Sequence, residues 1–270
     1  MSFDMHVHSN VSLDTDSSME AVAKSAIAKG LDGICFTDHL DLFEAKEVGK
    51  KCMHGYDAWK KGYEEIRQVR DLLGNSLEIL HGMEIAEIPM DTERAEKFIA
   101  SPDIDFVLGS IHMVKGYVDF YWMKFPDLAF CKSITEVYLN ENIQLAKLGL
   151  VDSIAHIGYS ERYMTRQGFF INLMDYEEQL RQLFSIMIQT GQGLEVNTSG
   201  LRQGIGCTFP NLSVLKLYKA LGGEIITIGS DSHNAQDVGS HIQKVEKLLK
   251  ELGFRYFTVF RQRKSCFIEL

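Results

Sequence analysis

The sequence lacks several features that would place it in a specialised class. It has no run of about 18 apolar residues, so we expect no membrane-spanning helix. Its first six residues have neither the basic nor the apolar region of a signal peptide. The five cysteines are odd in number, scattered and without a Cys-X-X-Cys pair. This argues against a disulfide framework or zinc ribbon and favours a reducing cytoplasm.

Basic residues are also in the minority. Lysine and arginine number 28 against 37 aspartates and glutamates, which gives a net charge of −9. An acidic chain is poorly suited to binding nucleic acid or an anionic membrane through its overall surface. The charge leaves the oligomeric state open. We therefore expect a small-molecule partner and neither a nucleic-acid nor a membrane partner.

The chain is poor in the residues that make linkers. It has only four prolines and no Gly/Ser-rich segment between two halves, which favours one domain over residues 1–270. Apolar residues make up 45% and charged residues 24% of the chain, and these values exclude disordered and fibrous classes.

Short β-rich runs alternate with longer helical patterns. Seven runs are predicted strands, at residues 3–8, 33–39, 77–85, 106–112, 153–158, 193–197 and 224–230. Helices are predicted at 18–28 (capped by Ser17 or Ser18, ended by Gly30), 57–73, 92–100, 134–148, 176–190, 214–221 and 242–251, with a late strand or hairpin at 257–260 and 265–269. Seven β-then-α units predict an α/β fold with a parallel seven-stranded (β/α)7 TIM-like barrel. A doubly wound open sheet is the alternative, but the sequence has no Gly-rich nucleotide fingerprint that favours it.

Seven of the nine histidines fall on the predicted strands or at their ends. His6 and His8 are two residues apart, as are Asp231 and His233, so each pair shares one face of a strand. In a closed barrel the first and last strands are neighbours, so the two pairs would lie side by side. The remaining strands carry His39, His81 with Glu84, His112 and His156. We expect His54 and His241 to be ordinary loop and helix residues.

This repetition predicts a multinuclear metal site. A lone strand histidine is more often a packed residue, but burying this many titratable groups without partners would be costly. Neutral imidazole together with carboxylate is the ligand set of Zn, Mn, Fe or Co. The carboxyl ends of barrel strands are also where barrel enzymes place their active sites.

The motifs resemble the polymerase-and-histidinol-phosphatase (PHP) superfamily. The resemblance runs through Asp4–Ser9, Thr37-Asp38-His39, Gly82-Met83-Glu84, Ser110-Ile111-His112, Ala155-His156 and Gly229–His233. It implies a distorted seven-stranded barrel and a phosphoesterase with two or three divalent metal ions (Zn, Mn or Fe). The length and the closing stretch of the chain most resemble the histidinol-phosphatase branch, which implies hydrolysis of L-histidinol phosphate.

The resemblance also implies which residues bind each metal. The first metal takes His6, His8, Glu84 and Asp231, and Glu84 bridges to a second metal that is completed by His112 and His156. A third metal takes His39, His233 and a residue after the first strand. Many family members have histidine there, whereas this chain offers Asp14, with Asp16 as the alternative. His81 matches no ligand position, and Asp4 is either a partner of an imidazole or an ordinary strand start.

We expect a hydroxide that bridges two metals to attack the phosphorus, since metal binding lowers the pKa of a water to roughly 7. Three divalent ions and three carboxylates would leave the site with a charge of about +3, which attracts a phosphate dianion. His233 or His39, beside Asp231, would assist catalysis if not fully committed to metal. Arg162 and Arg202, each expected in a loop on the active face, are candidate phosphate ligands.

Two segments are candidate lids over this site. Residues 113–130 form a long aromatic connection whose rings could stack on a cationic leaving group, paired with an acid such as Glu87 or Asp119, while half of the rings pack on the barrel. The second candidate is the stretch from Leu40 to Tyr63. Two other functions stay open: a phosphoesterase of the same fold that acts on nucleotides or nucleic-acid ends, and a non-catalytic metal-binding module.

Overall fold

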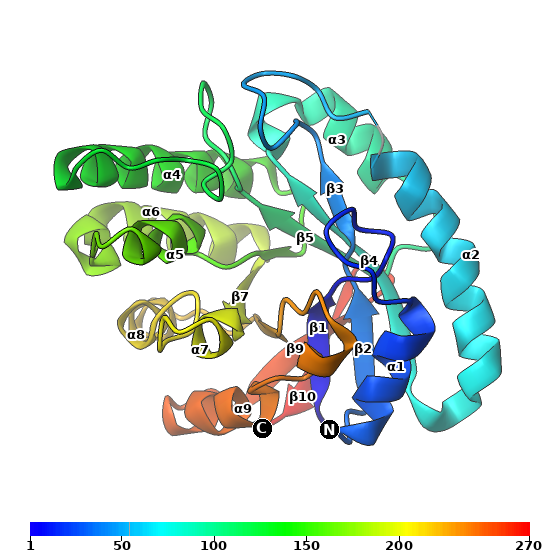
Figure 1. Ribbon diagram of the computed structural model, residues 1–270. Helices are drawn as coiled ribbons and strands as arrows, with labels where there is room; N and C mark the ends of the chain where they lie inside the picture. Colours follow the sequence, from blue (N-terminus) through cyan, green and yellow to red (C-terminus); the bar gives the residue numbers. More distant parts are fainter. Residues whose placement is uncertain (54) are drawn as a thin grey trace.

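Seven parallel strands form the wall of a barrel in the computed structural model, which describes residues 1–53 and 55–270 (Figure 1). In spatial order they are β1 (Phe3–Val7), β2 (Gly33–Phe36), β4 (Glu78–Ala86), β5 (Phe106–Ser110), β6 (Ser153–Ile154), β7 (Gly193–Asn197) and β8 (Ile226–Gly229). The predicted seven-stranded α/β barrel is confirmed, and the open-sheet alternative is wrong. His54 lies outside the described residues.

The barrel closes between its last and first strands at the carboxyl end only. The backbone N–H of Asp231 donates to the carbonyl of His6 at 2.8 Å, and that of His8 donates to the carbonyl of Ser232 at 3.0 Å. These two bonds bring the segment after β8 beside the segment after β1. The predicted neighbourhood of the pairs His6/His8 and Asp231/His233 is therefore confirmed.

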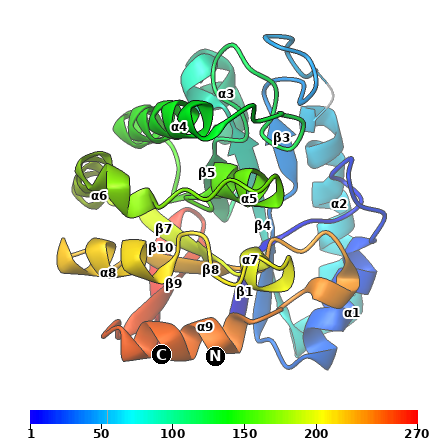
Figure 2. The same ribbon diagram turned by 60° about the vertical axis from the view of Figure 1, so that its left-hand side comes forward.

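The helices surround the strands, as Figures 1 and 2 show. They are α1 (Met19–Ala28), α2 (Gly55–Leu73), α3 (Thr92–Ile99), α4 (Leu128–Leu148), α5 (Tyr159–Arg166), α6 (Glu177–Thr190), α7 (Ser199–Arg202), α8 (Leu212–Ala220) and α9 (Ile242–Glu251). None of the described helices has an apolar stretch long enough to cross a membrane.

Local sequence explains where helix α1 begins and ends. Ser18 is the N-cap, and its hydroxyl accepts a hydrogen bond from the N–H of Ala21, which selects Ser18 over Ser17. Met19, Val22 and Ala26 recur at helical spacing and are buried against the barrel. Gly30 follows with φ of +72°, a conformation that glycine adopts without steric cost.

Two predicted strands are shorter than expected because their ends turn into the site. The predicted strand at 33–39 breaks after β2, resumes as β3 (His39–Asp41) and keeps the same register on β4. The break at Thr37 and Asp38 arises because Asp38 turns its carboxylate towards the loop after β1. The predicted strand at 153–158 ends at Ile154, since His156 adopts φ of +23°.

The predicted late hairpin is present as β9 (Tyr256–Arg261) and β10 (Lys264–Glu269), which pair antiparallel. Its turn reaches the amino end of the barrel, where Arg263 donates hydrogen bonds to the Asp152 carboxylate and to the carbonyl of Leu150. Arg261 pairs with Glu78 through two N–H groups, at 2.5 and 2.7 Å. The hairpin therefore supplies counter-charge to the buried Asp152 and to the partly exposed Glu78, at the end of the barrel opposite the metal-ligand motifs.

Candidate metal centre

The nine residues predicted to bind metal come together at the carboxyl end of the barrel. They come from the ends of β1, β3, β4, β5, β6 and β8 and from the loop after β1, and are His6, His8, Asp14, His39, Glu84, His112, His156, Asp231 and His233. Most of these side chains are fully buried, whereas His39 and His233 are partly exposed and Asp14 is largely exposed.

The first group joins β1, β4 and the segment after β8. The Nε2 atoms of His6 and His8 are 3.0 Å apart and lie 3.4 and 3.6 Å from Glu84 Oε2. They lie 3.8 and 3.6 Å from Asp231 Oδ1. Ligands that sit about 2.0–2.2 Å from a tetrahedral ion are separated from one another by roughly 3.3–3.6 Å. The spacing therefore fits a single divalent metal ion.

The second group shares Glu84 with the first. Glu84 Oε1 lies 3.1 Å from His112 Nε2 and 2.8 Å from His156 Nε2, while Oε2 of the same carboxylate faces His6 and His8. A carboxylate with one oxygen in each group is suited to bridge two metal ions.

The third group lies at the rim. Asp14 Oδ2 is 3.6 Å from His39 Nε2 and 3.0 Å from His233 Nε2, and the two nitrogens are 3.3 Å apart. In the described structure Asp14, rather than Asp16, is the carboxylate that contacts these imidazoles. The third group offers three ligand atoms, whereas the first group offers four.

The charges of these groups depend on one another. Burial alone would raise the pKa of Glu84, but the surrounding imidazoles, His112 and His6 foremost, hold it well below its usual value. Burial would lower the pKa of His6, but the carboxylates of Glu195 and Glu84 raise it well above its usual value. The buried carboxylate of Glu84 therefore requires positive charge close to it.

A buried polar atom without a partner tests whether metal ions fit. Glu84 Oε2 is buried and has no hydrogen-bond partner among the described residues, although imidazole nitrogens of His39, His6 and His8 surround it at 2.9–3.6 Å. Leaving such an oxygen unsatisfied is costly. Imidazole and carboxylate donors that converge around it are the ligand set of zinc, manganese and iron. The residues present therefore fit divalent metal ions.

Three further carboxylates, none of them among the nine candidate ligands, hold the ligand segments in place. The sequence did not reveal the role of any of the three. Asp38 accepts hydrogen bonds from the backbone and side-chain groups of Ser9 and Ser12 and fixes the loop after β1. Asp4 accepts the N–H groups of Ser230 and Gly239, so it bonds no imidazole. Glu195, on β7, accepts a bond from His6. Only its place as a charged residue within a short apolar strand could have signalled it.

The two candidate phosphate ligands have different surroundings. Arg162 lies on α5 and Arg202 on α7, so the prediction that both lie in loops was wrong. Arg162 is buried beside the centre, where its Nη2 donates to Ser199 Oγ at 2.7 Å and lies 3.3 Å from Asp231 Oδ2. Its Nε has no hydrogen-bond partner among the described residues, and Arg162 is one of the residues that line the cavity at the centre.

Arg202 uses its donors on protein groups instead. Its Nη1 and Nη2 each donate at 3.0 Å, to the carbonyls of Ser230 and Asp231, and its Nε lies 3.3 Å from Asp237. Asp231 has φ of +54°, a strained conformation for a residue other than glycine. These bonds join Arg202 to the backbone of Asp231, and the phosphate contact predicted for Arg202 stays a prediction.

A cavity of about 100 Å³ opens onto the centre. Its lining includes Glu84, the imidazoles and Arg162, and also Asp41, Asp119, Tyr159 and Tyr163. Tyr159 donates to Asp119 Oδ1 at 3.3 Å and packs on His112 with ring centroids 4.7 Å apart. Burial raises the pKa of Asp119 to about 6. The cavity therefore combines candidate metal ligands and a guanidinium with two further carboxylates, those of Asp41 and Asp119.

The family follows from comparison with known proteins. A family model of the PHP domain matches residues 4–199. This chain belongs to the PHP domain family. Two metal-ligand candidates of this PHP chain, Asp231 and His233, lie beyond the matched range.

Curated relatives and a solved structure resemble the PHP chain over nearly its full length. It is 29% identical over 257 residues to the "Probable histidinol-phosphatase" of Clostridium acetobutylicum, covering 94% of this chain and 95% of the relative. It is 26% identical over 272 residues to the histidinol-phosphatase of Lactococcus lactis, covering 97% and 95%. The histidinol phosphate phosphatase of Lactococcus lactis, solved with zinc, L-histidinol and phosphate, has the same fold, with a TM-score of 0.80, 24% identity and 98% coverage of both chains.

The candidate lids of the PHP chain differ in outcome. The stretch from Leu40 to Tyr63 includes part of strand β3 and the first turns of helix α2, and its role as a lid stays a prediction. In the segment 113–130, Phe120 and Phe125 are buried, whereas Tyr121 and Trp122 are exposed, which confirms that part of its rings pack on the barrel. The two segments touch, because the N–H of Asp119 donates to the carbonyl of Ala45.

Two predicted candidates lie away from the cavity or face elsewhere. His81 stacks on Trp59 and Tyr63 on the outer side of β4, so it is a packing residue. Glu87 accepts the backbone N–H groups of His112 and Met113 and anchors the loop after β5. Of the two acids suggested for a cationic leaving group, Asp119 is the one that lines the cavity.

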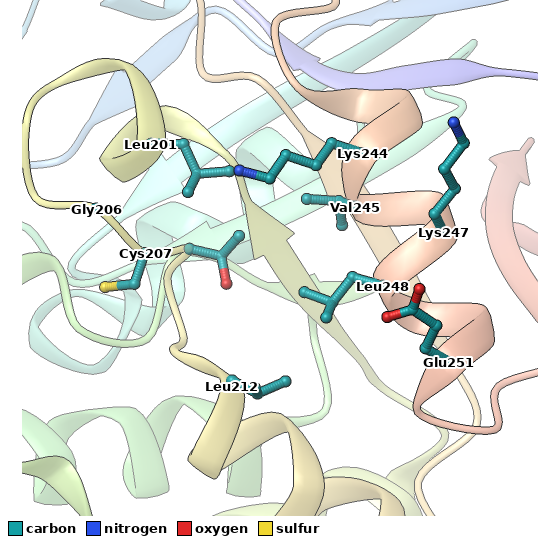
Figure 3. Close-up of a pocket in the computed structure, with 10 residues that line it drawn as sticks. Leu201, Gly206, Cys207, Leu212, Lys244, Val245, Lys247, Leu248 and Glu251 are labelled. Carbon is teal, nitrogen blue, oxygen red and sulfur yellow. The ribbon is translucent and has the colours of Figure 1, made fainter.

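A larger cavity of about 450 Å³ lies between α9 and the segment around α7 and α8 (Figure 3). Its walls include Leu201, Val245 and Leu248, and Lys244 extends across it towards Leu201. The residues that line it include none of the nine candidate ligands. Size alone therefore does not identify the reactive site.

Proposed function

We propose that this PHP chain is a metal-dependent phosphomonoesterase that hydrolyses L-histidinol phosphate to L-histidinol and phosphate. The observation that carries the proposal is a single cavity lined by the metal-ligand cluster and Arg162 and also by two carboxylates outside the cluster, those of Asp41 and Asp119. A substrate that fits it has a phosphate at one end and a positive charge at the other. The histidinol-phosphatases of Clostridium and Lactococcus, which align with nearly the whole chain, support the same substrate.

The chain's own residues bind and orient the phosphate. The Nε of Arg162 is buried and has no described partner, so it can donate to a phosphate oxygen, and Ser199 holds the same guanidinium in place. Divalent metals bound by the imidazoles and carboxylates would neutralise the phosphate oxygens and lower the pKa of a water, which then serves as the nucleophile. Burial of the ligand cluster keeps bulk water away from the reacting phosphorus.

His39 and His233 were predicted to assist the proton transfers. Their Nε2 atoms face Asp14, and His233 Nδ1 lies 3.2 Å from the carbonyl of Asp231. The His233 ring therefore has no nitrogen free to protonate a leaving group, and Nδ1 of His39 lies 2.9 Å from Glu84 Oε2. We therefore propose that both are ligands of the third site, with Asp14.

We place the leaving group of the substrate beside Asp119 and the neighbouring tyrosine rings. Asp119 accepts from Tyr159 and from the N–H of Tyr121, and its carboxylate is available to an ammonium group. Tyr159, Tyr163 and Tyr121 form a chain of ring contacts from the centre to the rim, at 5.0 and 5.7 Å between centroids. Such rings favour a cationic or aromatic leaving group, which matches the amine and imidazole of histidinol.

We further propose that the functional domain spans residues 1–270, because Asp231 and His233 lie on the segment that closes the barrel. The proposed compartment is the cytoplasm; the five cysteines are free, which agrees with reducing conditions. The proposed partner is this small-molecule ester.

The test is phosphate release by manganese-loaded protein from three esters: L-histidinol phosphate, its analogue without the amino group, and a nucleoside monophosphate. We expect kcat/KM for histidinol phosphate to exceed that for the nucleotide by a factor of about 100, or roughly 2.7 kcal/mol. A preference for the nucleotide would move the chain to another branch of phosphoesterases. No turnover of any ester would leave a metal-binding module.

A matched pair of variants tests the proposed role of Asp119. Asp119→Asn removes the proposed partner of the amine and should cut the preference for histidinol phosphate over its amine-free analogue. Asp127→Asn alters an exposed aspartate of the same segment, which caps α4, and asparagine caps helices equally well. An equal effect of both changes, or of neither, would contradict the role of Asp119.

A further inference from the structure

Glu195 lies at the junction of two metal-ligand groups, although it is in neither. Its side chain is 1% exposed and lies on the interior face of β7. Its Oε1 is 2.6 Å from His6 Nδ1, and its Oε2 accepts the backbone N–H of His156 at 2.7 Å. His6 belongs to the first group and His156 to the second. One carboxylate therefore contacts a residue from each.

The contact with His6 fixes the tautomer of that imidazole. His6 Nε2 faces His8, Glu84 and Asp231, so this nitrogen must be free of a proton to bind a metal. The proton then sits on Nδ1, where Glu195 accepts it in a hydrogen bond. A carboxylate in this position orients a metal-binding ring and raises its basicity.

The contact with His156 fixes a strained backbone. His156 has φ of +23°, in the left-handed region that residues other than glycine seldom adopt. This turn ends β6 and brings His156 Nε2 to 2.8 Å from Glu84 Oε1. Because the N–H of His156 has left the strand ladder, Glu195 is its acceptor.

Asn197, two residues further along the same face of β7, extends the connection. Its Nδ2 lies 3.3 Å from Glu195 Oε2 and 3.2 Å from Asp231 Oδ2. The pair therefore reaches three candidate ligands, which come from three different strands. Strand β7 itself contributes no ligand to the nine.

We propose that Glu195 is a positioning residue that couples the first and second metal sites. It sets the tautomer of His6 and the backbone of His156 at the same time, so its loss weakens both sites together. The inference rests on the proposed metal centre and is independent of the identity of the substrate.

The decisive variant is Glu195→Gln, which keeps the size of the side chain and removes its charge. A glutamine has one accepting oxygen, so it can serve His6 or the N–H of His156, but not both. If its NH₂ group faces His6 Nδ1, the ring must move its proton to Nε2 and cannot bind metal through that atom. Either orientation of the amide impairs one of the two sites.

The measurement is competition between the metal-free protein and a chromophoric chelator for zinc ions near neutral pH. We expect Glu195→Gln to bind zinc about 10 to 100 times more weakly than the unmodified protein. Cobalt substitution gives a second readout, because the visible bands of Co²⁺ report the geometry of its ligands. We expect these bands to change in the variant, which a loss of fold stability alone would not cause.

Asp152→Asn is the matched control. Asp152 is also a buried carboxylate that accepts a strand N–H, from Val107 at 2.8 Å, but it lies at the amino end of the barrel. The Asp152→Asn variant should be less stable than the unmodified protein and should bind zinc with the same affinity. Should Glu195→Gln fail to fold, Glu195→Asp takes its place, since the shorter carboxylate cannot reach both donors.

The outcomes separate this inference from the metal centre itself. If the unmodified protein binds no zinc, the metal centre and the proposed function fail. If it binds zinc and the folded Glu195 variant binds it equally well with unchanged cobalt bands, the role of Glu195 alone is overturned. Equal weakening in Asp152→Asn would also overturn it.

Discussion

Both ends of the barrel carry carboxylates, but the two ends balance the negative charge differently. At the amino end, Asp152 pairs with Arg263 and Glu78 pairs with Arg261. At the carboxyl end, Glu84 and Asp231 face clustered imidazoles, and one oxygen of Glu84 has no hydrogen-bond partner in the described part of the chain. A guanidinium is always charged, whereas an imidazole is charged near neutral pH only when its surroundings hold the proton.

This difference indicates which end is built for function. The amino end carries its own permanent counter-charges and is satisfied by the protein alone. The carboxyl end has ligand atoms at metal-like spacings and a carboxylate that still needs a cation. Residues in the left-handed region occur at both ends, at His156 and Asp231 and at Gln262 and Arg263, so they do not distinguish the two ends. The same barrel therefore separates stability from binding.

The largest expected effect comes from breaking the carboxyl end at its centre. Glu84→Gln removes the charge shared by two groups, so bound metal and phosphate release should both fall, the latter by about a thousandfold, since metal ions supply several kcal/mol to catalysis. Zinc content and kcat on histidinol phosphate measure this. The matched change at the amino end, Glu78→Gln, should leave kcat within about twofold. An equal loss of activity in Glu84→Gln and Glu78→Gln would contradict the functional difference between the two ends of the barrel.

Replacing Arg162 or Arg202 should have the next largest effect. We expect the two replacements to affect different properties, phosphate binding for Arg162 and metal binding for Arg202. Arg162→Ala removes a charged donor to phosphate and should raise KM by roughly 10 to 100 times, since such bonds contribute about 1.5–3 kcal/mol. Arg202→Ala should instead weaken zinc binding, because it frees the backbone of Asp231. Steady-state kinetics at saturating metal, with parallel zinc titrations, distinguish them. A rise in KM with unchanged zinc affinity in Arg202→Ala would support its predicted phosphate contact.

At the amino end, Asp152→Asn should affect stability alone. It leaves Arg263, which is 30% exposed, without its carboxylate partner and weakens the bond from the N–H of Val107. We expect a loss of about 1–3 kcal/mol in the free energy of unfolding, measured by urea denaturation of metal-free protein. Unchanged stability would show that the pairing with the hairpin contributes little.

The smallest expected effect concerns Asp119, which lines the cavity. Burial raises the pKa of Asp119 to about 6, so its carboxylate predominates above that pH and is lost as the pH falls through it. The preference for histidinol phosphate over the analogue without the amino group should therefore grow about tenfold between pH 5 and pH 7. In Asp119→Asn this ratio should stay flat. A ratio that rises equally in the variant would assign the pH dependence to another group.

Much of the fold could be predicted because its signals are local. Alternating strands and helices, and pairs of ligand residues two apart, predict a barrel and the face on which its histidines lie. Strand ends were predicted less well, since His156 and Asp38 leave the extended conformation to satisfy contacts with residues far along the chain. No local pattern encodes such a contact.

The same reason explains which site residues were missed. His6, Glu84 and Asp231 lie in short motifs, so the sequence alone suggests them. Glu195 contacts His6 from 189 positions away, and it lies on a strand, β7, that supplies no ligand. Arg202 is similar, since no local pattern encodes its bonds to the carbonyls of Ser230 and Asp231.

The most direct test of the contrast between the two ends is anomalous diffraction from zinc-loaded crystals, recorded at the zinc edge. The account predicts peaks at the carboxyl end of the barrel, about 2.0–2.2 Å from the ligand atoms of His6, His8 and Asp231 and from both oxygens of Glu84. It predicts none beside Asp152 and Glu78. A map without a peak between His6, His8, Glu84 and Asp231 would contradict the account.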